Sequence, residues 1–217
     1  MRPFVDSATL LAMSMEHNPN FLAILDDDES VQIALQDLIE SEGLSALCFS
    51  SAEQFLDSTA RYKASCLISD VRMPGMSGLE LQEKLKSEKC PLPIIFISAR
   101  GDIPMAVRAI QCGAIDFLTK PVDEAAFFNS VEKAFEQERA NRREATEHEA
   151  FAARYATLTP REKEVLALLV RGLLNKQAAF ELGITAYTVQ IHRGHIMRKM
   201  EADSFATLIK LTAKFTC

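Results

Sequence analysis

The chain has 217 residues, enough for one large domain or for two small ones that each bury a core. Its apolar and charged fractions, 48% and 25%, are those of an ordinary globular protein, and no apolar run approaches the roughly 20 residues of a membrane helix. The net charge of −6 conceals an asymmetry, because residues 1–156 carry 15 Lys and Arg against 25 Asp and Glu, whereas residues 157–217 carry 9 against 5. These values argue against a membrane partner and indicate that the basic C-terminal part binds a polyanion.

Residues 1–20 form a predicted N-terminal extension, which we expect to be flexible. Asp6 and Glu16 interrupt its apolar residues and no cleavage-site pattern follows, so a secretory signal is not expected. Met15 is an alternative start to Met1. The five cysteines are odd in number and lack metal-ligand spacing, which indicates reduced thiols in a cytoplasmic protein.

Residues 21–135 alternate short apolar runs with amphipathic stretches. The apolar runs cover residues 21–25, 46–49, 66–68, 94–97 and 115–118. Each run is too short for a buried helix, and a helix-like period follows it, as in Val31, Leu35, Leu38 and Ile39. Continuous apolar strands that alternate with helices predict a parallel sheet covered on both faces. We therefore expect an α/β domain with a doubly wound five-stranded parallel sheet of the flavodoxin-like type.

Two further segments complete the chain. Residues 136–156 are rich in charge and alanine without glycine or proline, and are predicted to form a helical linker that extends the last helix of the first domain.

Residues 157–217 form a second predicted domain of four helices. Its first three helices are expected over 160–171, 175–182 and 186–200, and its last one ends at Phe215. Thr159 can cap the first helix, and Pro160 suits its first position. The short second helix, the turn at Gly183 and the longer third helix form the pattern of a helix-turn-helix, although an ordinary small bundle has a similar periodicity.

Acidic, hydroxyl and amino side chains occur at the carboxyl ends of the predicted strands, where open α/β sheets bind ligands. They are Asp26, Asp27 and Asp28 after the first strand, Asp70 after the third, Ser98 after the fourth and Lys120 after the fifth. Clustered carboxylates repel one another unless a cation lies among them, and oxygen ligands with one or two carboxylates favour Mg²⁺. A phosphoryl group could be received by a carboxylate here, with Lys120 stabilising its charge and Ser98 donating a hydrogen bond to it.

Residues 21–133 resemble the receiver domain of two-component response regulators. The resemblance rests on four runs, Leu25 to Glu29, Ser69 to Gly78, Ile97 to Ala99 and Phe117 to Pro121. It implies that Asp70 accepts a phosphoryl group from a histidine kinase. It also implies that Asp27 binds Mg²⁺ directly, that Asp26 binds it largely through water, and that Arg72 offers its main-chain carbonyl to the metal.

The same resemblance implies a switch through a hydroxyl and an aromatic residue, here Ser98 and Phe117. Ser98 would turn toward the phosphoryl group, and Phe117 would turn inward to fill the vacated space. This movement would repack the face formed by the helix near 104–112 and the fifth strand. A plain core role for Phe117 is an alternative, and the resemblance further implies a cis bond between Lys120 and Pro121.

The third helix of the C-terminal domain has two contrasting faces. Val189, His192, Ile196 and Met200 share the face predicted to point inward, and the opposite face presents Gln190, Ile191, Gly194 and Arg198. An outward glycine and isoleucine fit a helix pressed into a DNA major groove, where Gln190 can read adenine and Ile191 can contact a thymine methyl group. The predicted phosphate contacts on either side are Lys176, Thr188, Arg193 and Lys199.

Three runs of this domain resemble the LuxR-type helix-turn-helix. They are Leu158 to Leu166, Gly172 to Lys176 and Thr188 to Arg193, and residues 189–200 and 101–106 are most similar to the FixJ-like branch. Some relatives carry a base-contacting lysine where this chain has Gly194, so the DNA sequence preferred by relatives does not transfer.

The two resemblances together predict a response regulator and not an enzyme. Phosphorylation of Asp70 would promote a homodimer that binds promoter DNA at two half-sites, an inverted repeat, about one helical turn apart, with RNA polymerase as a further expected partner. One alternative is a phosphatase of the haloacid-dehalogenase type with Asp26 as nucleophile and Asp28 as acid/base, but Asp70 precedes Ser98 and Lys120, which is the wrong order. A second alternative, a constitutive DNA-binding protein whose receiver only dimerises, has no support because no pocket residue is missing. A LuxR-type quorum sensor is excluded because no ligand-binding domain is recognisable.

Overall fold

The computed structural model describes residues 21–99 and 103–215, except for the side chain of Lys214. The predicted extension at 1–20, the alternative start Met15, Cys217 and the first two residues of the 101–106 run lie outside the described residues. Contacts divide the chain into two compact units, and the boundary between them along the sequence falls between Asn141 and Arg142. The predicted domain limits at 135/136 and 156/157 stay predictions.

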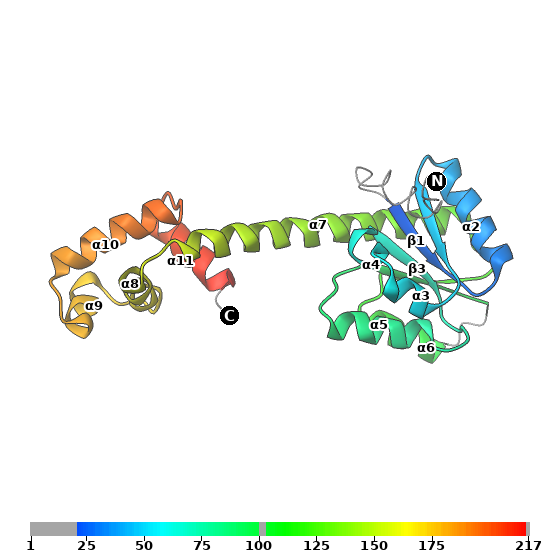
Figure 1. Ribbon diagram of the computed structural model, residues 1–217, viewed down its shortest axis with the longest axis horizontal. Coiled ribbons are helices and arrows are strands. Elements are labelled where there is room, and N and C mark those ends of the chain that lie inside the picture. Colours follow the sequence, from blue (N-terminus) through cyan, green and yellow to red (C-terminus); the bar gives the residue numbers. More distant parts are fainter. Residues whose placement is uncertain (1–20, 100–102, 216–217) are drawn as a thin grey trace, which may run out of the picture. The chain divides into compact units, whose positions relative to one another are not determined.

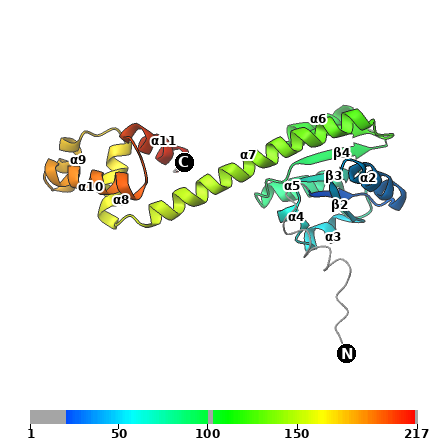
Figure 2. The same ribbon diagram turned by 90° about the horizontal axis from the view of Figure 1, so that it is seen from above.

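The first unit is built around five parallel strands in the order β2-β1-β3-β4-β5 (Figures 1 and 2). The strands are β1 (Phe21–Leu25), β2 (Ser45–Phe49), β3 (Cys66–Asp70), β4 (Ile94–Ser98) and β5 (Asp116–Thr119). The helices are α2 (Glu29–Ser41), α3 (Ala52–Asp57), α4 (Ala60–Lys63), α5 (Gly78–Ser87), α6 (Ile103–Gln111) and the first part of α7 (Glu124–Ala156). This strand order confirms the predicted doubly wound sheet.

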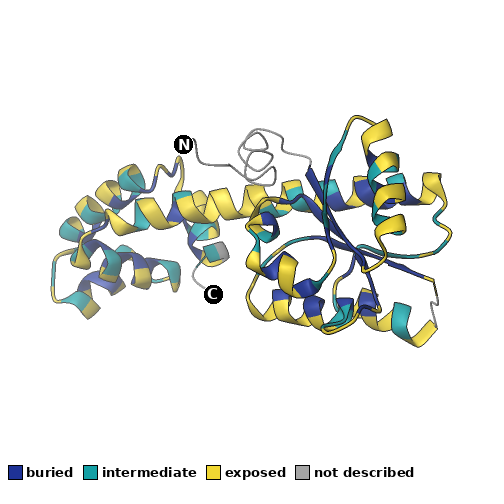
Figure 3. Cartoon of the chain, turned by 45° about the vertical axis from the view of Figure 1, so that its right-hand side comes forward, coloured by how far each residue is buried: buried dark blue, intermediate teal, exposed yellow. Residues whose placement is uncertain are grey.

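Alternate residues of each strand enter two separate cores. On β1, Phe21, Ala23 and Leu25 pack with α3, α4, α5 and α6, whereas Leu22 and Ile24 pack with α2 and α7. Since side chains alternate along a strand, covering both faces requires a continuous apolar run. Figure 3 shows the result as dark blue strands between helices whose outer sides are yellow.

The second unit contains the C-terminal part of α7 and four helices. They are α8 (Pro160–Val170), α9 (Asn175–Leu182), α10 (Ala186–Lys199) and α11 (Phe205–Phe215). Thr159 and Glu162 form a reciprocal capping box at the start of α8, with Pro160 at its first position. Gly183 ends α9 with φ of 64°, a left-handed conformation that favours glycine.

The core of this unit confirms most of the inward residues that were predicted. Val189, Ile196 and Met200 are buried as predicted, and they pack with the buried residues Val165, Leu166 and Leu169 of α8. Val170 and His192 are only half-buried, and the His192 Nδ1 atom is buried without a hydrogen-bond partner among the described residues.

Helix α7 contributes to the cores of both units. Phe127, Val131 and Ala134 belong to the core of the first unit, whereas Phe151 and Tyr155 belong to that of the second. Within the described residues, no helix is both long enough and apolar enough to cross a membrane.

Candidate functional site

Two carboxylates and one ammonium group meet at the carboxyl edge of the sheet. Asp26 directly follows β1 and is 2% exposed, and Asp70 ends the neighbouring strand β3 and is 8% exposed. The Lys120 Nζ atom, which follows β5, lies 2.6 Å from Asp26 Oδ2 and 2.9 Å from Asp70 Oδ1. The structure therefore brings together three predicted pocket residues that lie up to 94 positions apart in the sequence.

Backbone groups hold the second oxygen of each carboxylate. The Asp28 N–H donates to Asp26 Oδ1 at 3.0 Å, and the Arg72 N–H donates to Asp70 Oδ2 at 2.6 Å. Gln32 of α2 also donates to the Asp26 carbonyl oxygen at 2.6 Å. Both carboxylates are thus held in place by the loops that follow their strands.

Burial and neighbouring charges shift the pKa values of two groups at this site. Burial raises the pKa of the Asp26 carboxyl, and the hydrogen bond and charge of Lys120 only partly oppose that rise. Burial lowers the pKa of the Lys120 ammonium, but its hydrogen bonds to Asp26 and Asp70 outweigh this and the net direction is upward. Lys120 therefore stays protonated, and one positive charge faces two carboxylates.

The three consecutive aspartates have different environments. Asp26 is buried, Asp27 is exposed, and Asp28 is the cap of α2, where its side chain accepts from the Ser30 N–H at 2.9 Å. The described residues contain no group of three or more His, Cys, Asp or Glu side chains arranged to hold a metal ion. The predicted metal ligands are Asp26, Asp27, Asp70 and the Arg72 carbonyl. Of these, the structure brings the Asp26 and Asp70 carboxylates together, and Lys120 contacts both.

Gly78 allows α5 to begin directly against the site. A Cβ atom at this position would collide with the Asp70 carbonyl oxygen and would lie 2.8 Å from Ser69 Oγ. The Ser69 hydroxyl already donates to that carbonyl at 2.8 Å. Only glycine leaves room for this close approach between α5 and the end of β3.

The two predicted switch residues lie on adjacent strands. Ser98 is buried at the end of β4, and its carbonyl accepts the Lys120 N–H at 2.9 Å. Phe117 of β5 is half-buried, with its ring centroid 6.5 Å from that of Phe96 in the core. The bond between Lys120 and Pro121 is cis, as the resemblance implied.

A second candidate site lies on the outer face of α10. Gln190, Ile191, Gly194 and Arg198 are all exposed, as predicted for this face. A Cβ atom at Gly194 would meet no atom within 4 Å, so the packing of the chain itself gives no reason for a glycine there. Glycine in a helix interior costs about 1 kcal/mol relative to alanine, and no contact within the described residues accounts for a glycine at this position.

The residues predicted to contact DNA phosphates differ in the partners that they already have within the chain. Lys176 is exposed and forms no ion pair within the described part of the chain. The Arg193 Cζ atom lies 3.9 Å from the centroid of the Phe205 ring, a cation–π contact. The Thr188 hydroxyl lies 2.8 Å from that of Thr185, with which it shares a hydrogen bond.

Lys199 has partners within its own domain. Its Nζ atom lies 2.7 Å from Glu162 Oε2 and donates to the Thr157 carbonyl at 3.1 Å. The Glu162 side chain is 4% exposed and the Lys199 side chain is 34% exposed, so this ion pair is partly buried. These contacts give Lys199 a structural role, and we leave it out of the DNA contacts proposed below.

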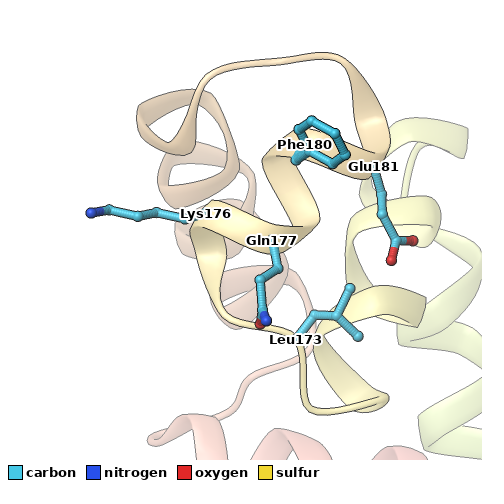
Figure 4. Close-up of a pocket in the computed structure, with 5 residues that line it drawn as sticks. All are labelled: Leu173, Lys176, Gln177, Phe180 and Glu181. Carbon is cyan, nitrogen blue, oxygen red and sulfur yellow. The ribbon is translucent and has the colours of Figure 1, made fainter.

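Several exposed apolar residues of this unit were not singled out from the sequence. Phe180 of α9 is 89% exposed and Tyr187 of α10 is 76% exposed. A pocket beside α9 is lined by Leu173, Lys176, Gln177, Phe180 and Glu181 (Figure 4). Phe180 and Tyr187 are aromatic residues of a kind that often packs in a helix core. Only the folded domain shows that these two side chains face solvent.

Comparison with known proteins identifies the family of each of the two parts of the chain. Residues 22–132 match the family model described as "Response regulator receiver domain", and residues 156–212 match that described as "Bacterial regulatory proteins, luxR family". The chain is 46% identical over 200 residues to the response regulator protein TodT of Pseudomonas putida, which covers 92% of this chain and 88% of the relative. It is 38% identical over 192 residues to the transcriptional regulatory protein FixJ of Bradyrhizobium diazoefficiens, and this alignment covers 88% of this chain and 93% of the relative.

A solved structure gives the same picture. The structure of the response regulator StyR matches 91% of this chain and 100% of its own, with a TM-score of 0.76 and 41% identity.

Proposed function

Because the chain belongs to the two-component response regulators that carry a LuxR-type DNA-binding domain, and is thus a transcription regulator and not a catalytic enzyme, we propose that Asp70 is its phosphoacceptor. The observation that carries the proposal is the Lys120 ammonium, which contacts both Asp26 and Asp70. A cation held at an acceptor carboxylate can stabilise the charge that a phosphoryl group adds.

In the proposed reaction, an Asp70 carboxylate oxygen attacks the phosphorus of a phosphohistidine in a histidine kinase. The new O–P bond forms as the P–N bond breaks, and the imidazole of the kinase leaves with the bonding electron pair. Lys120 offsets the charge of the acyl phosphate, and the Arg72 N–H keeps the carboxylate oriented.

We include Mg²⁺ as the cofactor because the donor atoms are of the chemical type that it prefers. Two carboxylates against one ammonium leave a net negative charge, and exposed Asp27 adds another beside them. Asp26, Asp27, Asp70 and the Arg72 carbonyl would supply the hard oxygen ligands that Mg²⁺ prefers. When bound, the metal would neutralise charge on the incoming phosphoryl group.

Phosphorylation is proposed to act through Ser98 and Phe117 on the surface of α6. Ile103, Val107 and Ile110 are 79%, 47% and 46% exposed and recur at the spacing of one helix face. Such an exposed apolar stripe is a feature of protein interfaces, and we propose that it forms the homodimer contact of the phosphorylated protein.

The outer face of α10 is proposed to enter the major groove of promoter DNA. Gln190 and Ile191 would contact base edges, Gly194 would allow close approach, and Arg198 would lie further along the groove. Lys176, Thr188 and Arg193 would hold phosphates. A dimer would bind two inverted half-sites about one helical turn apart, where RNA polymerase is a further candidate partner.

The phosphatase alternative loses its acid/base residue. The Asp28 carboxylate caps α2 through Ser30 and is exposed, so it does not share the pocket of Asp26 and Asp70.

The test compares the full chain with its Asp70→Asn variant after treatment with acetyl phosphate. We expect the variant to lose covalent labelling, measured by intact mass, and to lose the phosphodonor-stimulated increase in promoter binding. An Asp57→Asn variant, in which the changed residue ends α3, is the control and should behave as the unmodified chain. Stimulated DNA binding by the Asp70→Asn variant would contradict the proposal.

A further inference from the structure

A buried glutamine of α5 binds the main chain of α6. Gln82 is 4% exposed, and its Nε2 atom donates to the Ala109 carbonyl oxygen at 3.1 Å. A main-chain carbonyl can only accept a hydrogen bond, so the NH₂ group of the amide has to face it and the other half of the amide points away. The bond joins two helices through residues that lie 27 positions apart in the sequence.

The end of α6 is complete without this bond. The Ala109 carbonyl also accepts the Ala114 N–H at 3.0 Å, and Gly113, with φ of 103°, forms the turn after the helix. The Gln82 Oε1 atom is buried and has no hydrogen-bond partner among the described residues. A buried acceptor without a partner costs stability, and an apolar side chain of the same shape avoids that cost. The fold therefore gains little stability from a glutamine at this position.

Apolar packing holds α6 only weakly. All nine of its residues are described, and Ala109 is the one that is buried. Met105 adds a partly buried contact with the core. An ion pair of 2.6 Å between Arg108 and Glu83 also joins α6 to α5, but both side chains are exposed, and such pairs contribute little. The bond from Gln82 is thus a buried, directional contact that determines where this part of α6 lies on α5.

The anchored residue lies next to the exposed apolar stripe of α6. Ala109 is buried between Val107 and Ile110 in the sequence, and these two side chains belong to the stripe. An interface binds more tightly when it is already ordered, because ordering it on binding costs entropy. We propose that Gln82 is a positioning residue that holds α6 where its stripe can form the homodimer contact. This inference rests on the proposed homodimer and adds a residue outside the contact that controls its affinity.

The experiment uses the full chain with Gln82→Met, a substitution that keeps the approximate shape of the side chain and removes both halves of the amide. Sedimentation velocity with acetyl phosphate should give a dimer dissociation constant about fivefold higher, the factor that one hydrogen bond typically contributes. The initial rate of labelling, measured by intact mass, should stay the same because the bond lies outside the pocket. Unfolding in urea should show no loss of stability, since the unpaired acceptor is removed as well.

The matched control is Gln36→Met, the same chemical change on α2. Gln36 Nε2 donates to Glu40 Oε1 within that helix, so dimerisation should be unaffected. Gln82→Leu is a second apolar variant and should weaken the dimer in the same way.

Three results would overturn the inference. They are an unchanged dissociation constant in both Gln82 variants, an equal fall in the rate of labelling, which would make Gln82 a general core residue, and a dimer that forms without acetyl phosphate, which would mean that the bond restrains α6. Val107→Asp separates this inference from the proposed homodimer. If Val107→Asp weakens the dimer and the Gln82 variants do not, only the role of Gln82 is wrong. If Val107→Asp has no effect either, the stripe is not the dimer contact and both proposals fail.

Discussion

Lys199 and Glu162 join the end of α10 to the start of α8 through an ion pair of 2.7 Å between Nζ and Oε2. Glu162 also completes the capping box with Thr159, whose N–H donates to Glu162 Oε2 at 2.8 Å. One buried carboxylate therefore fixes both a helix start and the helix that carries the proposed DNA contacts.

We predict that Glu162→Gln lowers the free energy of unfolding by about 2 kcal/mol, because Lys199 and the cap lose a charged acceptor. Chemical denaturation at neutral pH measures this change. The matched control is Glu164→Gln, which removes only the exposed pair with Arg161 and should have little effect. An equal effect of both substitutions would contradict the role assigned to Glu162.

The same carboxylate predicts a pH dependence. Burial raises the pKa of Glu162, but the hydrogen bonds and charge of Lys199 and the bonds to Thr159 outweigh it and lower the pKa from 4.5 to about 2. A lowered pKa contributes stability that is complete above the unfolded value of 4.5 and is lost as the pH falls toward 2. The isosteric Glu162→Gln variant should therefore lose less stability between pH 5 and pH 3 than the unmodified chain, as measured by thermal unfolding.

Gly78→Ala should destabilise the first unit. Its Cβ atom would collide with the Asp70 carbonyl oxygen, and we expect a loss of about 2 kcal/mol, typical of overpacking against backbone. The displacement would also disturb the proposed phosphoacceptor, so the initial rate of labelling by acetyl phosphate should fall. Unfolding in urea and intact-mass kinetics give the two readouts, and unchanged values for both would disprove the close-approach argument.

Gly194→Ala should have the opposite effect on stability. Its Cβ atom meets nothing within 4 Å, so helix propensity should raise the free energy of unfolding by about 1 kcal/mol. If this face of α10 is pressed against DNA, the added methyl group should weaken promoter binding in spite of the more stable fold. A variant that is more stable and binds DNA equally well would show that the glycine is not at the DNA contact.

Val107→Asp should prevent dimerisation of the phosphorylated protein by placing a charge in the exposed stripe of α6. We expect the dimer dissociation constant to rise at least tenfold, which corresponds to about 1.4 kcal/mol. Sedimentation velocity with and without acetyl phosphate measures it. Ile33→Asp changes a comparably exposed apolar residue of α2 and serves as the control, so similar losses in both variants would point to a different interface.

The sequence was most informative where local pattern and burial agree. The run 21–25 coincides with β1 because both faces of a central parallel strand are covered. The capping residues Thr159 and Pro160 likewise marked the start of α8, since a helix end must satisfy its own N–H groups.

Side-chain partners between distant elements could not be predicted in this way. Lys199 carries the same charge as Lys176, yet one is held by Glu162 and the other is exposed without an ion pair among the described residues. The 2.6 Å hydrogen bond between the Asn175 and Gln190 side chains also depends on how α9 and α10 pack, which periodicity does not specify.

Asp26, Asp27 and Asp28 show that adjacent identical residues need not be interchangeable. Neutralising any one of them removes the same unit of charge, so native electrophoresis would not distinguish the three variants. Their environments nevertheless separate them into an ammonium contact, a solvent-facing carboxylate and a helix cap. Substitution of each aspartate in turn should therefore give three distinct phenotypes. The number of acidic residues alone does not predict these differences.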